Sequence, residues 1–342
     1  MKALLVRLSS IGDVVHTLPT LAALHRHGWD AGWVVEPASR PLLEDNPPLG
    51  QLVTAPPAKA FRWRQALAAV RALRTVRYDV ALDLQGLWKS ALWARASGAR
   101  RVIGYERFAR REPASAVLLH EQVPRGRRGG HVIDKNLALL RPLGIEAVGT
   151  REFPLPYQPE AVARVDHGLA GSEVQRFVIL NPGGGWASKL WPAERFGQLA
   201  PALRRLGLRC LVSYGPGEQA LAERVVAASS GAAQRAFPTT IVDFVELARR
   251  ARLVVAADTG PLHLACAVGT PVVALFGPTD PARNGPFAAE DEVVRHVPSC
   301  APCYRRGCSE HAGIMNDITT AEVLAAVERR LALAREQDSR AV

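Results

Sequence analysis

Short apolar runs alternate with longer amphipathic segments along most of this chain. Three apolar runs in the first half have the length of buried strands: residues 2–7, 33–35 and 78–83. Residues 63–73 show the apolar spacing of an amphipathic helix. A small polar turn, Ser9-Ser10-Ile11-Gly12-Asp13, follows the first strand and leads into a helical segment that ends near Gly28. This β-α-β alternation predicts a doubly wound parallel sheet, which binds ligands at the carboxyl ends of its strands.

The same alternation restarts after a proline-rich passage at residues 153–159, which is typical of a stiff linker. Four more strands are predicted at residues 177–180, 209–213, 253–257 and 272–276. A helix over 192–206 has proline at its first position and Gly207 at its end, and a last helix covers 320–336. We therefore expect an α/β protein of two Rossmann-like domains, residues 1–155 and 156–342, that face each other across a cleft, with the last helix able to pack back on the first domain.

Length and composition agree with two domains. A chain of 342 residues exceeds the size at which a single core stops growing, and 48% apolar residues suffice for two cores. No apolar run approaches the roughly 20 residues that span a bilayer, and Met1-Lys2 leads directly into a strand. We expect a cytoplasmic protein, in which five cysteines indicate thiols or a metal site more than disulfides.

The formal charge of +11 predicts a polyanionic partner: nucleic acid, an anionic membrane surface or a phosphorylated substrate. Many of the arginines fall in residues 95–128, where aromatic residues that could stack on bases are scarce. This scarcity argues against nucleic acid. A solvated basic face without a partner is the alternative.

Three turns of the second half are candidates for holding phosphate. The chain has neither a nicotinamide fingerprint nor a P-loop, so phosphate would be held by helix starts and single cations. The turns are residues 181–189 with Gly184, Gly185 and Lys189, residues 215–218 with Glu218, and residues 258–263 with Asp258, Thr259, Gly260 and His263.

Each turn also has a simpler interpretation. Asp258 and Thr259 are good helix caps, Glu218 is favoured by a helix dipole, and a lone histidine such as His263 is commonly structural. Three such turns at equivalent places in one domain favour a site that grips a phosphate beside a polyhydroxylated group, as in a nucleotide sugar.

Asp13 is the main catalytic candidate of the first half. Its place at a helix start lowers the pKa of a carboxyl, so it would be ionised and able to accept a proton from an attacking hydroxyl. A capping role is the alternative. Pro19 would break a helix that runs on from Asp13.

With these residues, the chain resembles the bacterial lipopolysaccharide heptosyltransferases of glycosyltransferase family 9 over residues 1 to about 330, and most closely heptosyltransferase I. The resemblance is carried by short motifs in the right order: residues 9–19, Arg62-Trp63-Arg64, residues 83–90, Arg111-Glu112-Pro113, Lys189-Leu190-Trp191-Pro192, Asp258-Thr259-Gly260 with His263, and Phe276-Gly277-Pro278-Thr279-Asp280-Pro281.

The resemblance implies a GT-B fold that transfers L-glycero-D-manno-heptose from ADP-heptose to a Kdo residue of Kdo-lipid A. It implies Asp13 as general base, Lys189 as the cation on the leaving diphosphate, Glu218 as a ribose contact and Asp258 as a ligand of heptose hydroxyls. Phosphate contacts are implied for Thr259, Gly260 and His263. Transfer would invert the anomeric centre without a metal or other cofactor.

The acceptor side is implied in the first domain. Family positions that meet the acidic Kdo sugars or line the acceptor site correspond to Ser10, Gly12, Arg62, Arg64, Gln85, Lys89 and Arg111. We expect peripheral, electrostatic association with the anionic inner leaflet of the cytoplasmic membrane.

Two features depart from the family pattern. Gly184-Gly185 replaces the paired threonines common near the donor phosphate, so backbone amides or water would supply those contacts. A cysteine cluster frequent in other members lacks its usual fourth cysteine near Ile314; Cys300, Cys303, Cys308 and His311 have spacing suited to tetrahedral zinc, and buried thiols in an ordered loop are the alternative.

Two other functions are compatible with the sequence. One is a later-acting heptosyltransferase or another family 9 sugar transferase. The other is a non-catalytic basic module that binds anionic lipid or nucleic acid.

Overall fold

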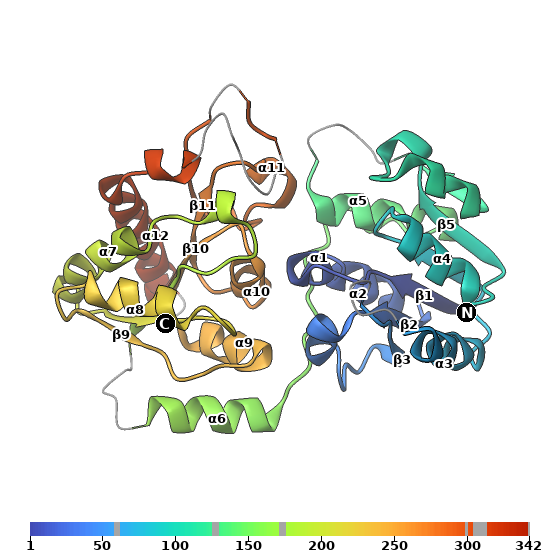
Figure 1. The fold of residues 1–342 in the computed structure, drawn as a ribbon, viewed down its shortest axis with the longest axis horizontal. Helices are drawn as coiled ribbons and strands as arrows, with labels where there is room; N and C mark the ends of the chain where they lie inside the picture. Colours follow the sequence, from blue (N-terminus) through green and yellow to red (C-terminus); the bar gives the residue numbers. More distant parts are fainter. Residues whose placement is uncertain (58–61, 125–129, 171–175, 298–299, 304–312, 341–342) are drawn as a thin grey trace. The chain divides into compact units, whose positions relative to one another are not determined.

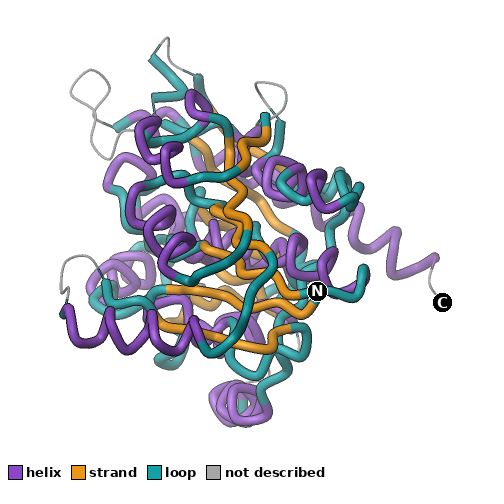
Figure 2. Tube along the Cα trace, turned by 90° about the vertical axis from the view of Figure 1, so that its right-hand side faces the viewer, coloured by secondary structure: helices purple, strands orange, loops and turns teal. Residues whose placement is uncertain are grey.

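The computed structural model describes residues 1–57, 62–124, 130–170, 176–297, 300–303 and 313–340, the last six of these by their backbone only. The chain divides into two compact units, Met1–Tyr157 and Gln158–Val342 (Figure 1). Each unit is a parallel sheet with flanking helices, shown in orange and purple in Figure 2.

The sheet of the first unit has the strand order β3-β2-β1-β4-β5-β6. All neighbouring strands run parallel, which agrees with the predicted β-α-β alternation. The strands are β1 (Lys2–Val6), β2 (Asp30–Val35), β3 (Leu49–Thr54), β4 (Val80–Asp83), β5 (Arg101–Tyr105) and β6 (Glu121–Val123).

In the described part of this unit, α-helices and short 3₁₀ helices lie between these strands and after the last of them. The helices are α1 (Ile11–Val15), α2 (Leu18–Arg26), α3 (Trp63–Arg74), α4 (Trp88–Ala96), α5 (Val132–Ala138), η1 (Pro37–Leu42), η3 (Arg107–Ala109), η4 (Pro113–Leu118) and η5 (Arg141–Leu143). Pro19 has the predicted effect: α1 ends at Val15, and Pro19 lies in the first turn of α2, where its missing N–H removes no helix bond.

The second unit has a sheet of order β12-β11-β10-β7-β8-β9, again parallel throughout. Its strands are β7 (Phe177–Asn181), β8 (Arg209–Val212), β9 (Ala233–Arg235), β10 (Leu253–Ala257), β11 (Val272–Phe276) and β12 (Glu292–Arg295). Counted from the first strand of each unit, the two sheets have the same order, 3-2-1-4-5-6, which is the order of a Rossmann fold.

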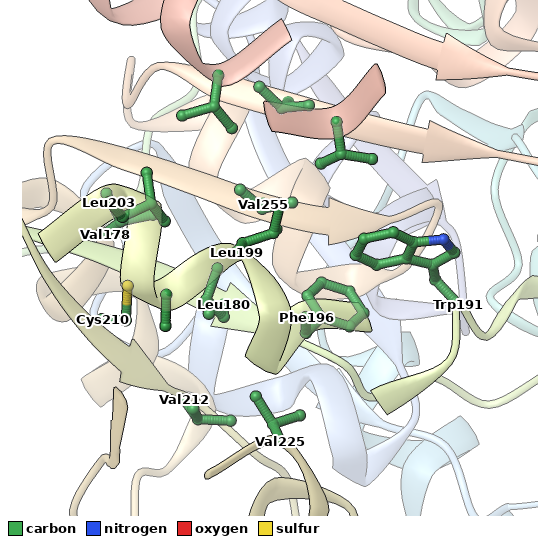
Figure 3. Close-up of a cluster of buried hydrophobic side chains, with 14 of the residues drawn as sticks. Val178, Leu180, Trp191, Phe196, Leu199, Leu203, Cys210, Val212, Val225 and Val255 are labelled. Atoms are coloured by element: carbon green, nitrogen blue, oxygen red, sulfur yellow. The ribbon is translucent and has the colours of Figure 1, made fainter. Parts of the chain in front are cut away.

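The helices of the second unit lie on both faces of its sheet. They are α6 (Pro159–Leu169), α7 (Ala193–Arg205), α8 (Gln219–Ala227), α9 (Ile241–Arg250), α10 (Gly260–Ala267), α11 (Pro281–Asn284) and α12 (Thr320–Arg340), with η6 (Ala187–Lys189) and η7 (Ile314–Asp317). On one face, α7, α8 and α12 pack on the strands in a cluster that includes Trp191, Phe196, Leu199 and Val255, drawn in Figure 3. Val323, Ala326 and Val327 place the first half of α12 in this core.

Both cores bury side chains on two faces of a parallel sheet, as the continuous apolar runs predict. Among the residues that the structure describes, no helix combines the length and apolar character that a membrane span requires.

Candidate functional site

Four loops meet at the carboxyl edge of the second sheet. Residues 182–189 follow β7, residues 215–218 follow β8, residues 258–259 follow β10, and residues 277–280 follow β11. Three of them are the turns that the sequence singled out. The carboxyl edge is where an open α/β sheet binds its ligands.

Asp258 is the centre of this edge, with its side chain only 1% exposed. The Lys189 ammonium donates to Oδ2 at 2.6 Å and to the Asp258 carbonyl at 3.0 Å. His263 Nε2 lies 3.1 Å from Oδ1. Two further donors come from residues that the sequence did not single out as site residues: Thr279 Oγ1, 2.6 Å from Oδ2, and Asn284 Nδ2, 2.6 Å from Oδ1.

These donors fix the charge of Asp258. Burial alone would raise the pKa of its carboxyl, but the hydrogen bond and charge of His263, together with those of Lys189, hold that pKa well below its usual range. The group is an anion at neutral pH, so the imidazole nitrogen that faces it carries a hydrogen.

Lys189 lies at the end of η6 with its side chain 15% exposed. Besides Asp258, its ammonium contacts the face of the Trp186 ring, 4.6 Å from the centroid. Asp258 also directly precedes Thr259, the N-cap residue of α10, which makes no side-chain capping bond. The first N–H groups of α10 and the Lys189 cation therefore lie at one edge of the sheet and favour an anion.

Glu218 connects two of the loops. Its Oε1 accepts a hydrogen bond from the Gly184 N–H at 3.0 Å, and its Oε2 accepts one from the Gly215 N–H at 2.8 Å. A carboxylate at this position holds the glycine-rich loop against the next turn. Its predicted ribose contact stays a prediction.

Gly184 is required by close packing. A Cβ at this position would lie 2.7 Å from Cγ2 of Thr259, which is closer than real Cβ contacts. Gly185, in contrast, has open space around the corresponding position. The loop after β7 therefore lies against the start of α10 at Gly184, and there is room beside Gly185.

In the first unit, the Asp13 carboxylate has the geometry of a capping box. Its Oδ2 accepts from the Ser10 N–H at 3.3 Å and from the Ser10 hydroxyl at 3.1 Å. Arg7 Nη2 lies 3.4 Å from Oδ1, and the Asp13 side chain is 35% exposed. The group lies beside a cation and still reaches solvent, so the capping interpretation and a catalytic one are both compatible with its place.

The other polar candidates of the first unit follow neighbouring strands. Gln85 comes after β4 and accepts a hydrogen bond from the Leu8 N–H at 3.0 Å, which joins its turn to the one that carries Ser10 and Gly12. Lys89 pairs with Glu36 at 2.8 Å. These side chains lie along the carboxyl edge of the first sheet.

Three arginines predicted for the acceptor are exposed. Arg62 precedes α3 and Arg64 belongs to it, with the Arg64 guanidinium 5.3 Å from the Trp63 ring centroid. Arg111 follows β5 and η3. Within the described part of the chain, none of the three forms an ion pair.

A buried ion pair that the sequence did not reveal lies beside Arg111. Asp83, the last residue of β4, pairs with Arg110, and both side chains are 0% exposed. Asp83 also accepts the N–H groups of Gln85 and Gly86 at 3.1 Å, while Arg110 Nε donates to Ser115 Oγ at 2.9 Å. The pair fixes both the turn of Gln85 and the segment of Arg111.

The proposed zinc set is only partly visible. Cys308 and His311 lie outside the described residues, while Cys300 and Cys303 are described and half-buried. Among the residues described, no group of three or more histidine, cysteine or acidic side chains is arranged for a metal ion.

Comparison with known proteins agrees with the motifs. A family model described as glycosyltransferase family 9 (heptosyltransferase) matches residues 66–313. The chain is similar to lipopolysaccharide heptosyltransferase 1 of Pseudomonas aeruginosa, with 30% identity over 90% of this chain and 88% of that protein. It is also similar to lipopolysaccharide heptosyltransferase 3 of Escherichia coli, with 27% identity over 94% of this chain and 96% of that protein.

Among solved structures, E. coli heptosyltransferase WaaC with ADP has a similar fold, with a TM-score of 0.76 and 23% identity over 96% of this chain and all of that one. E. coli ADP-heptose lps heptosyltransferase II has a TM-score of 0.78, with 20% identity over 98% of this chain. The chain is therefore a glycosyltransferase with the GT-B fold and belongs to glycosyltransferase family 9, the heptosyltransferases.

Proposed function

We propose that this enzyme transfers L-glycero-D-manno-heptose from ADP-heptose to a Kdo residue of Kdo-lipid A, in the inner core of lipopolysaccharide. The relative at 30% identity is named lipopolysaccharide heptosyltransferase 1. The observation that carries the donor assignment is the Lys189 ammonium at the edge where α10 begins, because a diphosphate needs a cation and helix N–H groups of this kind.

On the donor side, Lys189 and the start of α10, with Thr259, Gly260 and His263, bind the diphosphate. Gly184, Gly185 and Glu218 form the wall beside the nucleoside. Lys189 and the helix dipole neutralise the charge that develops on the departing ADP, which is the main electrostatic contribution of this unit.

On the acceptor side, a Kdo hydroxyl oxygen attacks the anomeric carbon of the heptose while its proton passes to the Asp13 carboxylate. The bond between that carbon and the diphosphate oxygen breaks, so ADP leaves and the anomeric centre is inverted. Arg62, Arg64 and Arg111 bind the Kdo carboxylates, with Ser10, Gly12, Gln85 and Lys89 near the attacking sugar.

An assay with ADP-heptose and Kdo-lipid A tests this function. UDP- and GDP-sugars serve as donor controls, and an acceptor that already carries one heptose tests a later step in the core. Turnover with the first pair alone supports the proposal. Turnover only with the heptosylated acceptor would assign a later addition, and turnover with neither acceptor would contradict heptosyl transfer.

The acceptor arginines make a first prediction. Replacing Arg62, Arg64 and Arg111 together with alanine should raise the KM for Kdo-lipid A at least about ten-fold, because exposed charge-assisted contacts to carboxylates are lost. The KM for ADP-heptose should change by less than about two-fold. Arg71→Ala, an exposed arginine on α3, is the matched control. Equal increases in both KM values would count against the assignment.

We also propose that the first unit binds the anionic membrane surface where its acceptor resides. An apolar corner supports this: Trp88 and Leu92 of α4, with Phe108 and Val117 of η3 and η4, are all exposed, Phe108 by 89% and Val117 by 76%. The helices α4, η3 and η4 pack together, and Arg107 lies 5.8 Å from the Phe108 ring centroid. Exposed aromatic side chains beside arginines are typical of a membrane interface.

A vesicle experiment tests the apolar corner. Replacing Phe108 and Val117 with serine should reduce sedimentation with phosphatidylglycerol vesicles several-fold, and higher salt should weaken binding of the unaltered enzyme. Val148→Ser, an exposed valine of the same unit, is the matched control. If the double variant and the control sediment alike, this corner is not the membrane contact.

A further inference from the structure

We infer that Thr279 and Asn284 are positioning residues for the leaving-group cation: they fix the Asp258 carboxylate so that it presents the Lys189 ammonium to the donor diphosphate. The inference rests on the proposed donor site. It also gives a role to the segment after β11, whose motif matches the family but has no assigned part in the proposed chemistry.

The first argument is the saturation of the Asp258 carboxylate. An ionised carboxylate offers about four lone-pair positions. Here Oδ1 takes His263 and Asn284, and Oδ2 takes Lys189 and Thr279, at 2.6 to 3.1 Å. A sugar hydroxyl could bind Asp258 only by displacing one of these donors. The geometry therefore points to a role for Asp258 that acts through Lys189, beside the heptose contact that the family resemblance implies and that stays a prediction.

The second argument is that Thr279 and Asn284 are committed to this carboxylate. They are 4% and 8% exposed, so neither is placed to meet solvent. Asn284 Nδ2 donates to Asp258, while its Oδ1 is buried and makes no hydrogen bond within the described part of the chain. Burying the amide with its oxygen unpaired costs folding free energy. The hydrogen bond that the amide donates to Asp258 is therefore the contact for which an asparagine is needed here.

The third argument is the rigidity of the segment that carries the two residues. Proline at positions 278 and 281 restricts its backbone, and the Asp280 carboxylate caps α11 by accepting the Ala282 N–H at 3.0 Å. A Cβ at Gly285 would lie 2.6 Å from the Pro281 carbonyl oxygen, so this turn is closely packed. A rigid segment can hold two donors on one carboxylate without losing their geometry when a ligand binds.

The orientation of Asp258 matters because the Lys189 side chain is long and flexible, so its ammonium takes its position from the groups that it contacts. Its ammonium is fixed by the Asp258 carboxylate and carbonyl and by the Trp186 ring. If the carboxylate rotates, the position of the cation changes with it. Removing the Thr279 hydroxyl should therefore weaken recognition of the phosphate that Lys189 contacts and leave the adenosine contacts intact.

Calorimetric titration with ADP and with AMP tests this directly, since AMP lacks the second phosphate. Thr279→Val keeps the shape of the side chain and removes the hydroxyl. We expect ADP affinity to fall about ten-fold, the effect of losing one hydrogen bond to a charged group, while AMP affinity changes by less than about two-fold. Thr279→Ser should restore ADP binding, and Asn284→Leu should repeat the loss.

Thr270→Val is the matched control. Thr270 precedes β11, is 6% exposed and donates to the Ala248 carbonyl at 2.7 Å, so its hydroxyl is equally buried but remote from Asp258 in the hydrogen-bond network. It should lower the melting temperature without changing the ratio of ADP to AMP affinity. The inference would be overturned if the ratio of ADP to AMP affinity were the same in Thr279→Val, in Asn284→Leu and in the unaltered enzyme. An unaltered enzyme that does not prefer ADP to AMP would instead contradict the proposed donor site.

Discussion

Replacing Asp13 with asparagine is expected to lower kcat by about 10²- to 10⁴-fold, the range that a general base contributes. Asparagine has nearly the same shape but cannot accept the acceptor proton, so ADP-heptose should still bind with unchanged affinity. Single-turnover rates and calorimetric donor titration measure the two effects separately.

A second aspartate of the chain provides the control for Asp13. Asp243 occupies the same N3 position of a capping box, on α9, and likewise has an arginine beside it, Arg164. Asp243→Asn should cost stability through the lost cap, about 0.5 to 2 kcal/mol, without slowing turnover. If Asp13→Asn lowers only the melting temperature, as Asp243→Asn does, Asp13 is a cap and not the base.

Arg110→Met is expected to destabilise the first unit by about 3 to 5 kcal/mol. The substitution leaves the Asp83 carboxylate buried without its cation, although the N–H groups of Gln85 and Gly86 still donate to it. Urea-induced unfolding, followed by a signal from the first unit, measures the loss. Because Arg111 and the turn of Gln85 depend on the pair, the KM for Kdo-lipid A should also rise.

An exposed ion pair of the same unit provides the comparison. Arg101 and Glu121 pair at 2.6 Å with side chains 42% and 38% exposed, so Arg101→Met should cost at most about 1 kcal/mol. Replacing Asp83 and Arg110 together by apolar residues of similar size should recover part of the stability, since no buried charge is then left alone. Equal losses for Arg110→Met and Arg101→Met would contradict the role of the buried pair.

The central strands of both sheets could be predicted from the sequence because most positions in them are apolar and buried. Strands β7, β10 and β11 are buried at all five positions, and the predicted ranges differ from the observed ones by one residue at most. Edge strands carry no such signal: β12 alternates between partly and fully exposed positions, and β6 and β9 have three residues each. They form because a neighbouring strand offers unpaired backbone groups, which the local sequence does not encode.

The candidate site could likewise be predicted only in part. The turns of Lys189, Glu218 and Asp258 could be found because glycine, charge and a following helix coincide in a few residues. That Asp258 binds both Lys189 and His263, and that Glu218 holds the Gly184 loop, depends on distances between loops 69 and 34 residues apart along the chain. Asn284 gave no signal, because a single asparagine after a proline-rich turn has no pattern of its own.

The shared strand order of the two sheets places related groups at equivalent positions of the two units. In each, an aspartate at the carboxyl end of the fourth strand is held by a side chain from the segment after the fifth: Asp83 by Arg110, and Asp258 by Thr279 and Asn284. In each, the segment after the first strand carries a proposed catalytic residue, Asp13 or Lys189. The same framework would therefore serve two different tasks in the proposed mechanism, with the segment after the first strand supplying the proton acceptor in one unit and the charge for the leaving group in the other.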